Sequence, residues 1–296
     1  MTDLKIGVIG LAGKWSTQVL ADEIEKLTGF RLIIELNQVA ADLEQRRLIY
    51  QDHNLCELDA LIIKKAGASY HPGMIDQLEM LRLAENQGVR IFSAPEKIIR
   101  LVDRLSCTMT LSSANIPMPP TFATEQIEQA HQAINRFQHA VLKPLFSTKA
   151  KGMELVKANQ HKLRDTLAAY KKQHGFFYIQ QKLDLPGQDL GLMFIGGEYQ
   201  GAYARVKGQK SWNTSTANGG KYAAAQASPE MIDIAQRAQA LFDLDITTVD
   251  MADTAHGPVC FEVSAFGGFK GAQQGLGLNI AERYIHYIIH QLSDQT

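Results

Sequence analysis

The chain has 296 residues, of which 45% are hydrophobic and 21% charged, and its formal net charge is −1. This length is typical of two domains or one elaborated fold. The near-neutral charge favours neither a nucleic-acid-binding nor an anionic-membrane surface, and no apolar run approaches the roughly 20 residues of a transmembrane helix. The N-terminus lacks a signal-peptide pattern and the three cysteines are far apart, so we expect a cytoplasmic protein without a disulfide or zinc scaffold.

The first part of the chain alternates apolar strands with helices. Strands are expected within LKIGVIGLAG, FRLIIELN, LDALIIKKAG and RIFSAP, and helices over WSTQVLADEIEKL and GMIDQLEMLRLAENQGV. This alternation predicts a small, doubly wound parallel sheet of the α/β class. We place this domain at residues 1–95.

The turn after the first strand carries Gly7, Gly10 and Gly13, followed by Lys14. The spacing fits neither a P-loop nor the G-x-G-x-x-G pattern of dinucleotide-binding domains. Close packing at a strand–turn–helix junction explains the glycines equally well. Contact of this turn with a ligand is left open.

The second part of the chain has a different order. One helix is expected over PEKIIRLVDRLSCTMTLSSANI, ending at PMPPT, and another over ATEQIEQAHQAINRF. Strands follow with short turns at 141–146, 153–157, 176–183, 190–196 and 199–206, with a hairpin at Gly196–Gly197. This part is therefore predicted to be α+β with antiparallel pairing. The last helix, IAERYIHYIIHQL, could pack inward or form a dimer seam, and its His286 and His290 are read as surface or packing residues.

A basic, hydroxyl-rich stretch follows the strand that ends in KP. Lys143 lies in that strand, and the residues from Ser147 to Gly152 join it to the next one. Backbone N–H groups, hydroxyls and lysines on a flexible turn can form a phosphate cradle. The alternative is a plain basic hairpin turn.

Two acidic residues near the C-terminus are expected on neighbouring antiparallel strands. Asp250 ends one apolar strand, and Glu262 and Ser264 share a face of the next by the period-2 rule. Such converging oxygens are ligands that magnesium prefers, and the metal would then be the counter-charge of Glu262. The alternative is a structural ion pair of a carboxylate with Lys143 or Arg205.

Taken in order, the lysine in KP with its glycine-bearing loop, the segment YIQQKLDLPGQD, the aspartate strand and EVSAFGGFKG resemble the ATP-grasp superfamily, in particular the RimK-like carboxylate–amine ligases. DRLSCTMTLSSANIPMPPT is similar to another segment of that family, and KPLFSTKAKGM is most similar to its GAK-system branch. The resemblance implies an α/β pre-ATP-grasp domain followed by an α+β ATP-grasp fold at residues 96–296. Its lid subdomain, at about 112–182, and its catalytic subdomain, at about 183–296, would clamp ATP.

The resemblance also implies roles for single residues. Lys143 and Arg205 would be catalytic, with Arg205 facing the reacting carboxyl, and Asp250, Glu262 and Ser264 would bind magnesium or manganese. ATP would be bound by Arg104, Lys143, Ser147, Thr148, Lys149, Gly152, Gln180, Gln181, Lys182, Leu183 and Asp189, with Asp189 on the ribose and Gln180 to Leu183 as the hinge at the adenine edge. The substrate would contact Trp212, Asn213, Asn218, Gly219 and Gly268.

The sequence departs from the family pattern at several of these places. Ser264 replaces an asparagine, which implies a weaker metal ligand, and Gln181 replaces a glutamate. Gly191 and Asn218 stand where relatives that act on glutamate-like substrates have arginines. Since those arginines clamp carboxylates, we expect a flatter, less acidic substrate or a peptide segment. For Trp212, an ordinary packing role is the alternative.

The function implied is an ATP-dependent ligase that joins a carboxylate to an amine through an acyl phosphate, giving ADP and phosphate. Its partners would be ATP, a carboxylate and an amine acceptor, either small molecules or peptides, without nucleic acid or membrane; homo-oligomerisation is left open. One alternative is an ATP-binding protein of the same fold with regulatory or degenerate activity. Another is a dehydrogenase built on the N-terminal unit, which the missing dinucleotide motif disfavours.

Overall fold

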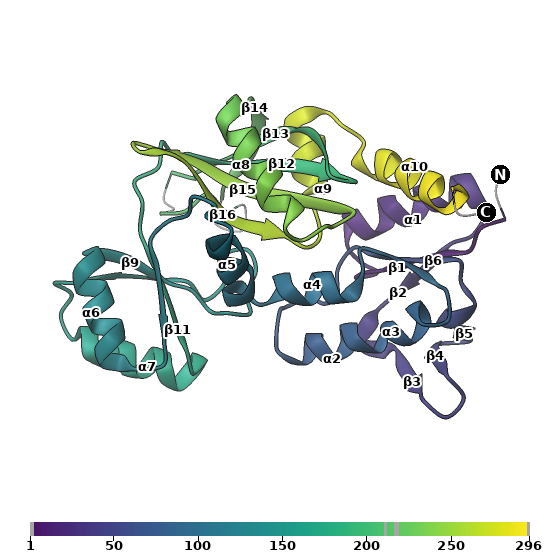
Figure 1. Ribbon diagram of the computed structural model, residues 1–296, viewed down its shortest axis with the longest axis horizontal. Coiled ribbons are helices and arrows are strands. Elements are labelled where there is room, and N and C mark those ends of the chain that lie inside the picture. The colour runs from purple at the N-terminus through teal and green to yellow at the C-terminus, as the bar shows by residue number, and fades with distance from the viewer. Residues whose placement is uncertain (1–2, 210–211, 216–218, 295–296) are drawn as a thin grey trace.

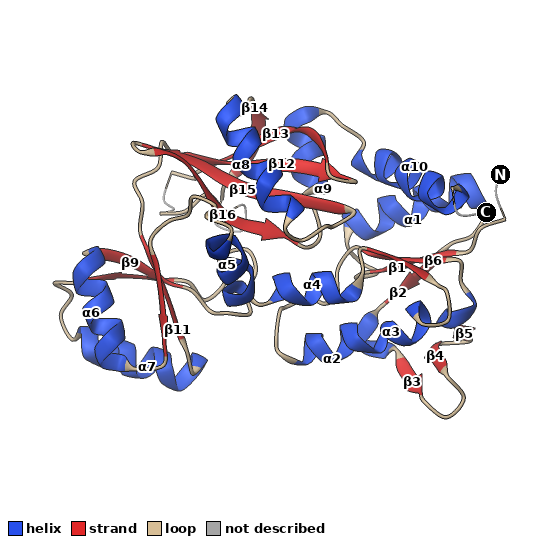
Figure 2. Cartoon of the chain, in the orientation of Figure 1, coloured by secondary structure: helices blue, strands red, loops and turns tan. Residues whose placement is uncertain are grey.

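The structure of the protein is a computed structural model that describes residues 3–209, 212–215 and 219–294. The molecule is elongated: the N-terminal parallel sheet and both chain ends lie at one end, and an antiparallel sheet with α6 and α7 lies at the other (Figure 1). A larger antiparallel sheet lies along the top of the view, with helices on both sides (Figure 2). None of the described helices is long and apolar enough to cross a membrane.

The N-terminal sheet is parallel throughout, as predicted. Its strand order is β2-β1-β6-β7, with β1 at Ile6–Ile9, β2 at Leu32–Ile34, β6 at Ala60–Ile63 and β7 at Arg90–Phe92. Every residue of β1 and β6 is buried, which explains why these strands are apolar without alternation. Helix α1 (Trp15–Thr28) covers the sheet and ends at Gly29, whose φ is 74°.

Several elements of this unit differ from the prediction. The helix expected over 73–89 is two helices, α2 (Gly73–Met80) and α3 (Arg82–Glu85). A three-stranded antiparallel ribbon was not predicted; it comprises β3 (Ala40–Asp42), β4 (Arg47–Tyr50) and β5 (His53–Asn54), flanked by short 3₁₀ turns at Leu36–Gln38 and Leu55–Glu57. Its strands have two to four residues, which is too short for a recognisable hydrophobic period.

Two of the three glycines predicted for the first turn serve close packing, and Gly7 lies within β1 rather than in the turn after it. A Cβ at Gly7 would lie 2.8 Å from Ile34 Cδ1, and one at Gly10 would lie 2.6 Å from Thr17 Oγ1. At Gly13, by contrast, no atom of the described residues lies within 4 Å of such a Cβ. Packing therefore accounts for the first two glycines.

The helix predicted over 95–116 is also divided, into α4 (Pro95–Val102) and α5 (Arg104–Ser113). Asp103 between them has an extended backbone, and its Oδ1 accepts a hydrogen bond from the N–H of Leu105 at 3.0 Å. This side-chain cap starts a new helix and explains the break. It also places Arg104 in the first turn of α5.

The lid sheet is antiparallel, with the order β10-β9-β11-β8. Its strands are β8 (Thr121–Thr124), β9 (His139–Leu142), β10 (Glu154–Lys157) and β11 (Phe177–Gln181), and α6 (Ile127–Phe137) and α7 (Leu163–His174) pack on it around their own core. Two predictions need correction: α6 starts four residues later than expected because 121–124 is a strand, and β9 ends before Lys143. The backbone N–H of Lys143 still donates to the Tyr178 carbonyl at 3.0 Å.

The third sheet has five antiparallel strands in the order β14-β13-β12-β15-β16. They are β12 (Gln188–Ile195), β13 (Glu198–Val206), β14 (Lys221–Ala225), β15 (Ile246–Thr254) and β16 (Gly257–Ser264). The hairpin at Gly196–Gly197 is confirmed, since it joins β12 to β13. Helix α8 (Pro229–Ala240) packs on β15 and β16, and α9 (Phe269–Leu276) packs on β13 and β14.

The last helix, α10 (Ile280–Ser293), lies beside α1 (Figure 1). It buries Ile280, Ala281, Tyr284, Ile285 and Ile288 in the same core as the strands of the N-terminal sheet. The apolar face of this helix therefore packs inward. Its His290 is exposed and contacts Asp294 at 3.0 Å, which agrees with a surface role. The domain boundaries at residues 95, 112 and 182 stay predictions.

Candidate active site

A cleft of about 480 Å³ lies between the lid sheet and the five-stranded sheet. This volume is typical of a small-molecule or cofactor site. Most of the predicted site residues line it: Arg104, Lys143, Thr148, Lys149, Gln180, Gln181, Lys182, Leu183, Asp189, Arg205, Trp212, Asn213, Asp250, Glu262, Ser264 and Gly268. Ser147, Gly152 and Gly219 are not among the lining residues, and Asn218 lies outside the described residues.

The floor of the cleft is one face of the five-stranded sheet. Asp250 is directly opposite Glu262, and Thr248 is opposite Ser264, in the register of β15 and β16. Directly opposite residues of an antiparallel pair point to the same side, so the two carboxylates and the Ser264 hydroxyl share the cleft face. The sequence prediction of converging oxygens is therefore confirmed in its geometry.

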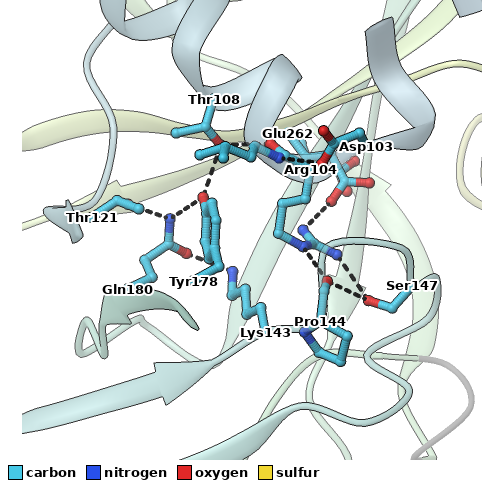
Figure 3. Close-up of polar contacts among 12 residues, drawn as sticks. Asp103, Arg104, Thr108, Thr121, Lys143, Pro144, Ser147, Tyr178, Gln180 and Glu262 are labelled. Carbon is cyan, nitrogen blue, oxygen red and sulfur yellow. Dashed lines mark hydrogen bonds and ion pairs between the residues drawn. The ribbon is translucent and has the colours of Figure 1, made fainter. Parts of the chain in front are cut away.

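Arg104 is the counter-charge of Glu262 in this structure. Its Nη1 lies 2.7 Å from Glu262 Oε2, and Nη2 and Nε donate to Ser147 Oγ at 3.2 Å and the Pro144 carbonyl at 3.3 Å (Figure 3). The Arg104 side chain is only 8% exposed, so a charged partner is required. Glu262 is therefore paired with Arg104, from 158 residues away, whereas the predicted alternative of a carboxylate paired with Arg205 is found at Asp250.

Arg205 joins two carboxylates on neighbouring strands. Its Nη1 lies 3.0 Å from Asp250 Oδ2, and its Nε donates to Asp189 Oδ2 at 3.1 Å. Burial raises the pKa of Asp250 to about 7; Arg205 opposes this shift, and the nearby Glu262 adds to it. Asp189, predicted to bind a ribose, is 8% exposed and faces Arg205 here.

Lys143 projects from the lid toward the centre of the cleft. Its Nζ donates to Gln180 Oε1 at 2.5 Å, and the Gln180 amide donates in turn to Thr121 Oγ1 at 3.1 Å (Figure 3). Burial, and then the positive charge of Arg104, lower the pKa of Lys143 to about 7. Among the residues that the structure describes, this ammonium group has no carboxylate partner, as is typical of a group that binds an anion.

The hinge strand β11 ends at the edge of the cleft. The N–H groups of Gln181 and Lys182 donate to the carbonyls of Pro120 at 2.8 Å and His139 at 2.9 Å. Both N–H groups are therefore already engaged in hydrogen bonds within the lid. Further along the chain, Lys182, Leu183 and Asp184 line the cleft.

Two loops meet over the cleft. In the loop after β9, Lys149 and Ala150 have φ values of 57° and 60°, an uncommon conformation for residues other than glycine. The Ser215 hydroxyl of the second loop donates to the Lys149 carbonyl at 3.1 Å. Trp212, in that second loop, is 40% exposed and lines the cleft, which disfavours the alternative of a packing anchor.

Tyr203 is a cleft residue that the sequence reading missed. It is 2% exposed, and its ring is surrounded by Gly191, Gly268, Gly271 and Gly275, at each of which a Cβ would collide with it. At Gly191 that Cβ would lie 2.6 Å from Tyr203 Cζ. The spacing of the last three glycines, three and four residues apart on one helix face, was the signal available in the sequence.

Two side chains of the N-terminal unit reach the loop that follows Ser264, and they too were missed. Lys64 Nζ donates to the Phe266 carbonyl at 2.6 Å and lies 4.3 Å from the centroid of the Phe269 ring. The Tyr70 ring packs edge-on against Phe266, with 6.1 Å between ring centroids. The loop of residues 64–70 is therefore attached to the loop that follows β16, beside the cleft.

The donor set fits magnesium. Among the described residues, no group of three or more His, Cys, Asp or Glu side chains could hold a metal ion. The protein would therefore offer the carboxylates of Asp250 and Glu262 with the Ser264 hydroxyl, all of them oxygen donors. Magnesium usually takes one or two carboxylates and fills its remaining positions with water and phosphate oxygens.

Comparison with known proteins shows which family this chain is similar to. A family model described as the RimK-like ATP-grasp domain matches residues 101–288. A tetrahydromethanopterin:alpha-L-glutamate ligase of Methanosarcina acetivorans is 27% identical over 261 residues, which cover 79% of this chain and 81% of that protein. One of Methanocaldococcus jannaschii with the same name is 26% identical and covers 97% of this chain and 98% of its own length.

Solved structures show the same fold. D-alanyl-alanine synthetase A of Vibrio cholerae has a TM-score of 0.75 at 16% identity, covering 99% of each chain. The ATP-grasp ligase PsnB, complexed with a minimal precursor, has a TM-score of 0.74 at 15% identity, covering 98% of this chain and 99% of that one. PsnB has also been solved with Mg and ADP, in a structure with a TM-score of 0.73 at 15% identity that covers 99% of this chain and all of its own.

Proposed function

The chain belongs to the RimK-like ATP-grasp family, and from that premise we propose that its cleft binds ATP with magnesium and joins a carboxylate to an amine through an acyl phosphate. The observation that carries this proposal is the cross-strand pair of Asp250 and Glu262 in a cleft that is also lined by Lys143 and Lys149, neither of which has an ion-pair partner among the described residues. Carboxylates on one wall and lysine ammonium groups on the other suit a metal–triphosphate complex.

The predicted ATP-grasp fold and the prediction of a C–N bond-forming ligase are confirmed by these comparisons, since the named relatives are ligases of this kind. They favour the ligase over the degenerate nucleotide-binding protein and the dehydrogenase. The finer similarity to the GAK-system branch stays a prediction.

The nucleotide would lie along the hinge with its phosphates toward Lys143. Since the lid uses the N–H groups of Gln181 and Lys182, the adenine edge would pair with the Lys182 carbonyl and the Leu183 N–H. Lys143 would take up a proton and hold the phosphates, with Thr148 and Lys149 closing over them. Asp250, Glu262 and Ser264 would hold magnesium. The metal would neutralise the negative charge that develops during γ-phosphoryl transfer.

The reaction has two steps that balance without any further reactant. A carboxylate oxygen attacks the γ-phosphorus, the bond to the ADP oxygen breaks, and ADP leaves. An amine then attacks the acyl carbon, the bond to phosphate breaks, and the amine gives up a proton. Arg205, on the floor of the cleft, would stabilise the tetrahedral oxyanion of the second step, and the contact of Ser215 with Lys149 would help to exclude water.

The test is trapping of the acyl phosphate. The protein is incubated with ATP, magnesium and hydroxylamine in the presence of single carboxylates, and ADP and hydroxamate are measured together. We expect ADP release that depends on a carboxylate and that is matched by hydroxamate. ATP binding without carboxylate-stimulated ADP release across the panel would support the alternative of a nucleotide-binding protein without ligase activity.

A further inference from the structure

A buried lysine of the N-terminal unit holds the loop of residues 265–268, which joins β16 to α9. Lys64 directly follows β6, and its Nζ donates to the Phe266 carbonyl at 2.6 Å. A second, longer contact joins the same Nζ to the Gly267 carbonyl at 3.5 Å. The ammonium group also lies over the Phe269 ring, 4.3 Å from its centroid. One side chain thus contacts both the loop and the first residue of α9.

Packing alone does not explain a lysine at this position. The ion pairs of lysines in the described part of the chain belong to Lys26, Lys97 and Lys182, and Lys64 is not among them. Removing an ammonium group from water is costly when no carboxylate compensates it, and an apolar side chain of similar length would avoid that cost. What the ammonium group provides, and an apolar group could not, is its contact with the two backbone carbonyls.

These contacts determine which way two peptide groups of the loop face. In a trans peptide the carbonyl of one residue and the N–H of the next point in opposite directions. Since the carbonyls of Phe266 and Gly267 face Lys64, the N–H groups of Gly267 and Gly268 face away from it. Among the described residues neither N–H group donates to a backbone carbonyl, and both glycines line the cleft. Lys64 therefore orients backbone groups of the cleft wall from behind.

The five-stranded sheet holds the two ends of the same segment. At its start, the Thr247 hydroxyl donates to the Ser264 carbonyl at 2.7 Å. At its end, the Tyr203 ring packs against Gly268, where a Cβ would lie 2.9 Å from Tyr203 Cζ. Between these two ends, the middle of the loop is held by Lys64 of the N-terminal unit.

We propose that Lys64 is a positioning residue, which orients the backbone of Gly267 and Gly268 for the substrate without touching the substrate itself. Lys64 is not among the residues that line the cleft, so it acts through the loop. This inference rests on the proposed ligase function for the word substrate. Since ATP is proposed to lie along the hinge and the lid, its binding should not depend on Lys64.

The first test is hydrogen–deuterium exchange of the full chain in the wild type and in Lys64→Met, which has a side chain of similar length without the charge. We expect the amides of residues 265–271 to exchange at least fivefold faster in the variant, and those of β9 in the lid to be unchanged. Lys5→Met is the matched control, because Lys5 is exposed and precedes β1, and it should exchange like the wild type. Lys64→Gln keeps a donor and should be intermediate, and it provides the comparison if Lys64→Met does not fold. Wild-type exchange at 265–271 in the folded variant would overturn the proposal.

The second test is the KM for each substrate, measured by hydroxamate formation with the most active carboxylate. In Lys64→Met the KM for the carboxylate should rise at least tenfold, and the KM for ATP should stay within twofold of the wild type. A merely structural role would lower the amount of folded enzyme, and so kcat, and leave both KM values unchanged; that result would also overturn the proposal. Wild-type exchange in the variant with hydroxamate formed would remove the role of Lys64 but leave the ligase. Faster exchange, with no hydroxamate formed even by the wild type, would remove the ligase and leave Lys64 as the residue that orders this loop.

Discussion

Each charged group on the cleft floor is held by a different partner. Glu262 is held by Arg104 from α5, and Asp250 by Arg205 from β13. In the described part of the chain, the Lys143 ammonium donates to the neutral side-chain carbonyl of Gln180. Among the described residues, Lys143 thus reaches the cleft without an ion-pair partner, whereas Asp250 is paired with Arg205 and burial raises its pKa to about 7.

Replacing Glu262 by glutamine tests the acidic pair. Glu262→Gln keeps an acceptor for Arg104, so we expect a loss of stability of only about 1–3 kcal/mol. Magnesium-dependent ADP formation should fall at least a hundredfold, because one of two carboxylate ligands is lost. Asp253→Asn is the control: Asp253 is on the same strand as Asp250 but exposed, and should behave as the wild type. Turnover within threefold of the wild type in Glu262→Gln would remove the metal-binding role of this residue.

The depressed pKa of Lys143 makes ATP binding a protonation event. With a pKa of about 7 in the free protein, Lys143 is mostly neutral at pH 8, and phosphate oxygens beside it would raise that pKa. Binding at pH 8 should therefore take up a proton, measured by calorimetry in buffers of different ionisation enthalpy. Lys143→Arg stays charged and should take up less. Equal proton uptake by both proteins would contradict the contact of Lys143 with the phosphates.

At the level of elements, α9 packs on β13 through one aromatic ring and a set of glycines. Tyr203 on β13 faces Gly268, Gly271 and Gly275 at the start of α9 and along it, and Gly191 on β12. With side chains at these positions the helix could not lie this close to the strand. The packing thus fixes the loop between Ser264 and α9, which carries the predicted substrate contact Gly268.

A double-mutant cycle tests this packing. In Gly268→Ala the new methyl group would collide with the Tyr203 hydroxyl, so we expect a loss of about 1–3 kcal/mol in the free energy of unfolding. Tyr203→Phe removes the colliding oxygen and should recover part of that loss, with a coupling of at least about 0.5 kcal/mol. Gly13→Ala, where nothing lies within 4 Å, should cost little. Additive effects in the cycle would show that Gly268 does not pack on the hydroxyl.

In the molecule as a whole, the N-terminal sheet is joined to the active site by a buried lysine. Lys64 is 6% exposed and hydrogen-bonds the Phe266 carbonyl, 202 residues away. Burial, and then the charge of Lys65, lower the pKa of Lys64 to about 7 from its ordinary value of 10.5. Between these two pH values the unfolded chain binds more protons than the folded one, so the contribution of Lys64 to stability rises with pH in that window.

Lys64→Met removes this dependence. The melting temperature of the wild type relative to the variant should rise from pH 6.5 to pH 9, and a change of about 1 kcal/mol corresponds to roughly 2–4 °C for a chain of this size. Lys143 contributes to the pH dependence of stability with the same sign as Lys64. Because both proteins contain Lys143, its contribution cancels when their melting temperatures are subtracted. A constant or falling difference over this range would show that Lys64 is not buried as an ammonium group at low pH.

The sequence by itself determined the features that depend on neighbouring residues. Strand–helix alternation predicted the parallel sheet, the glycine pair predicted the hairpin, and the period of two placed Glu262 and Ser264 on one face. The opposition of Asp250 and Glu262 follows from two strands joined by a short turn. Such patterns are local, because strand pleat and turn geometry are decided within about ten residues.

Only the tertiary structure decided which distant groups meet. The pairing of Arg104 with Glu262, the ring of Tyr203 among the glycines, and the hydrogen bond of Lys64 to the Phe266 carbonyl all join segments that are far apart in the sequence. The physical reason is that burial and charge pairing between units depend on how their faces pack, and no local period in the sequence encodes that packing.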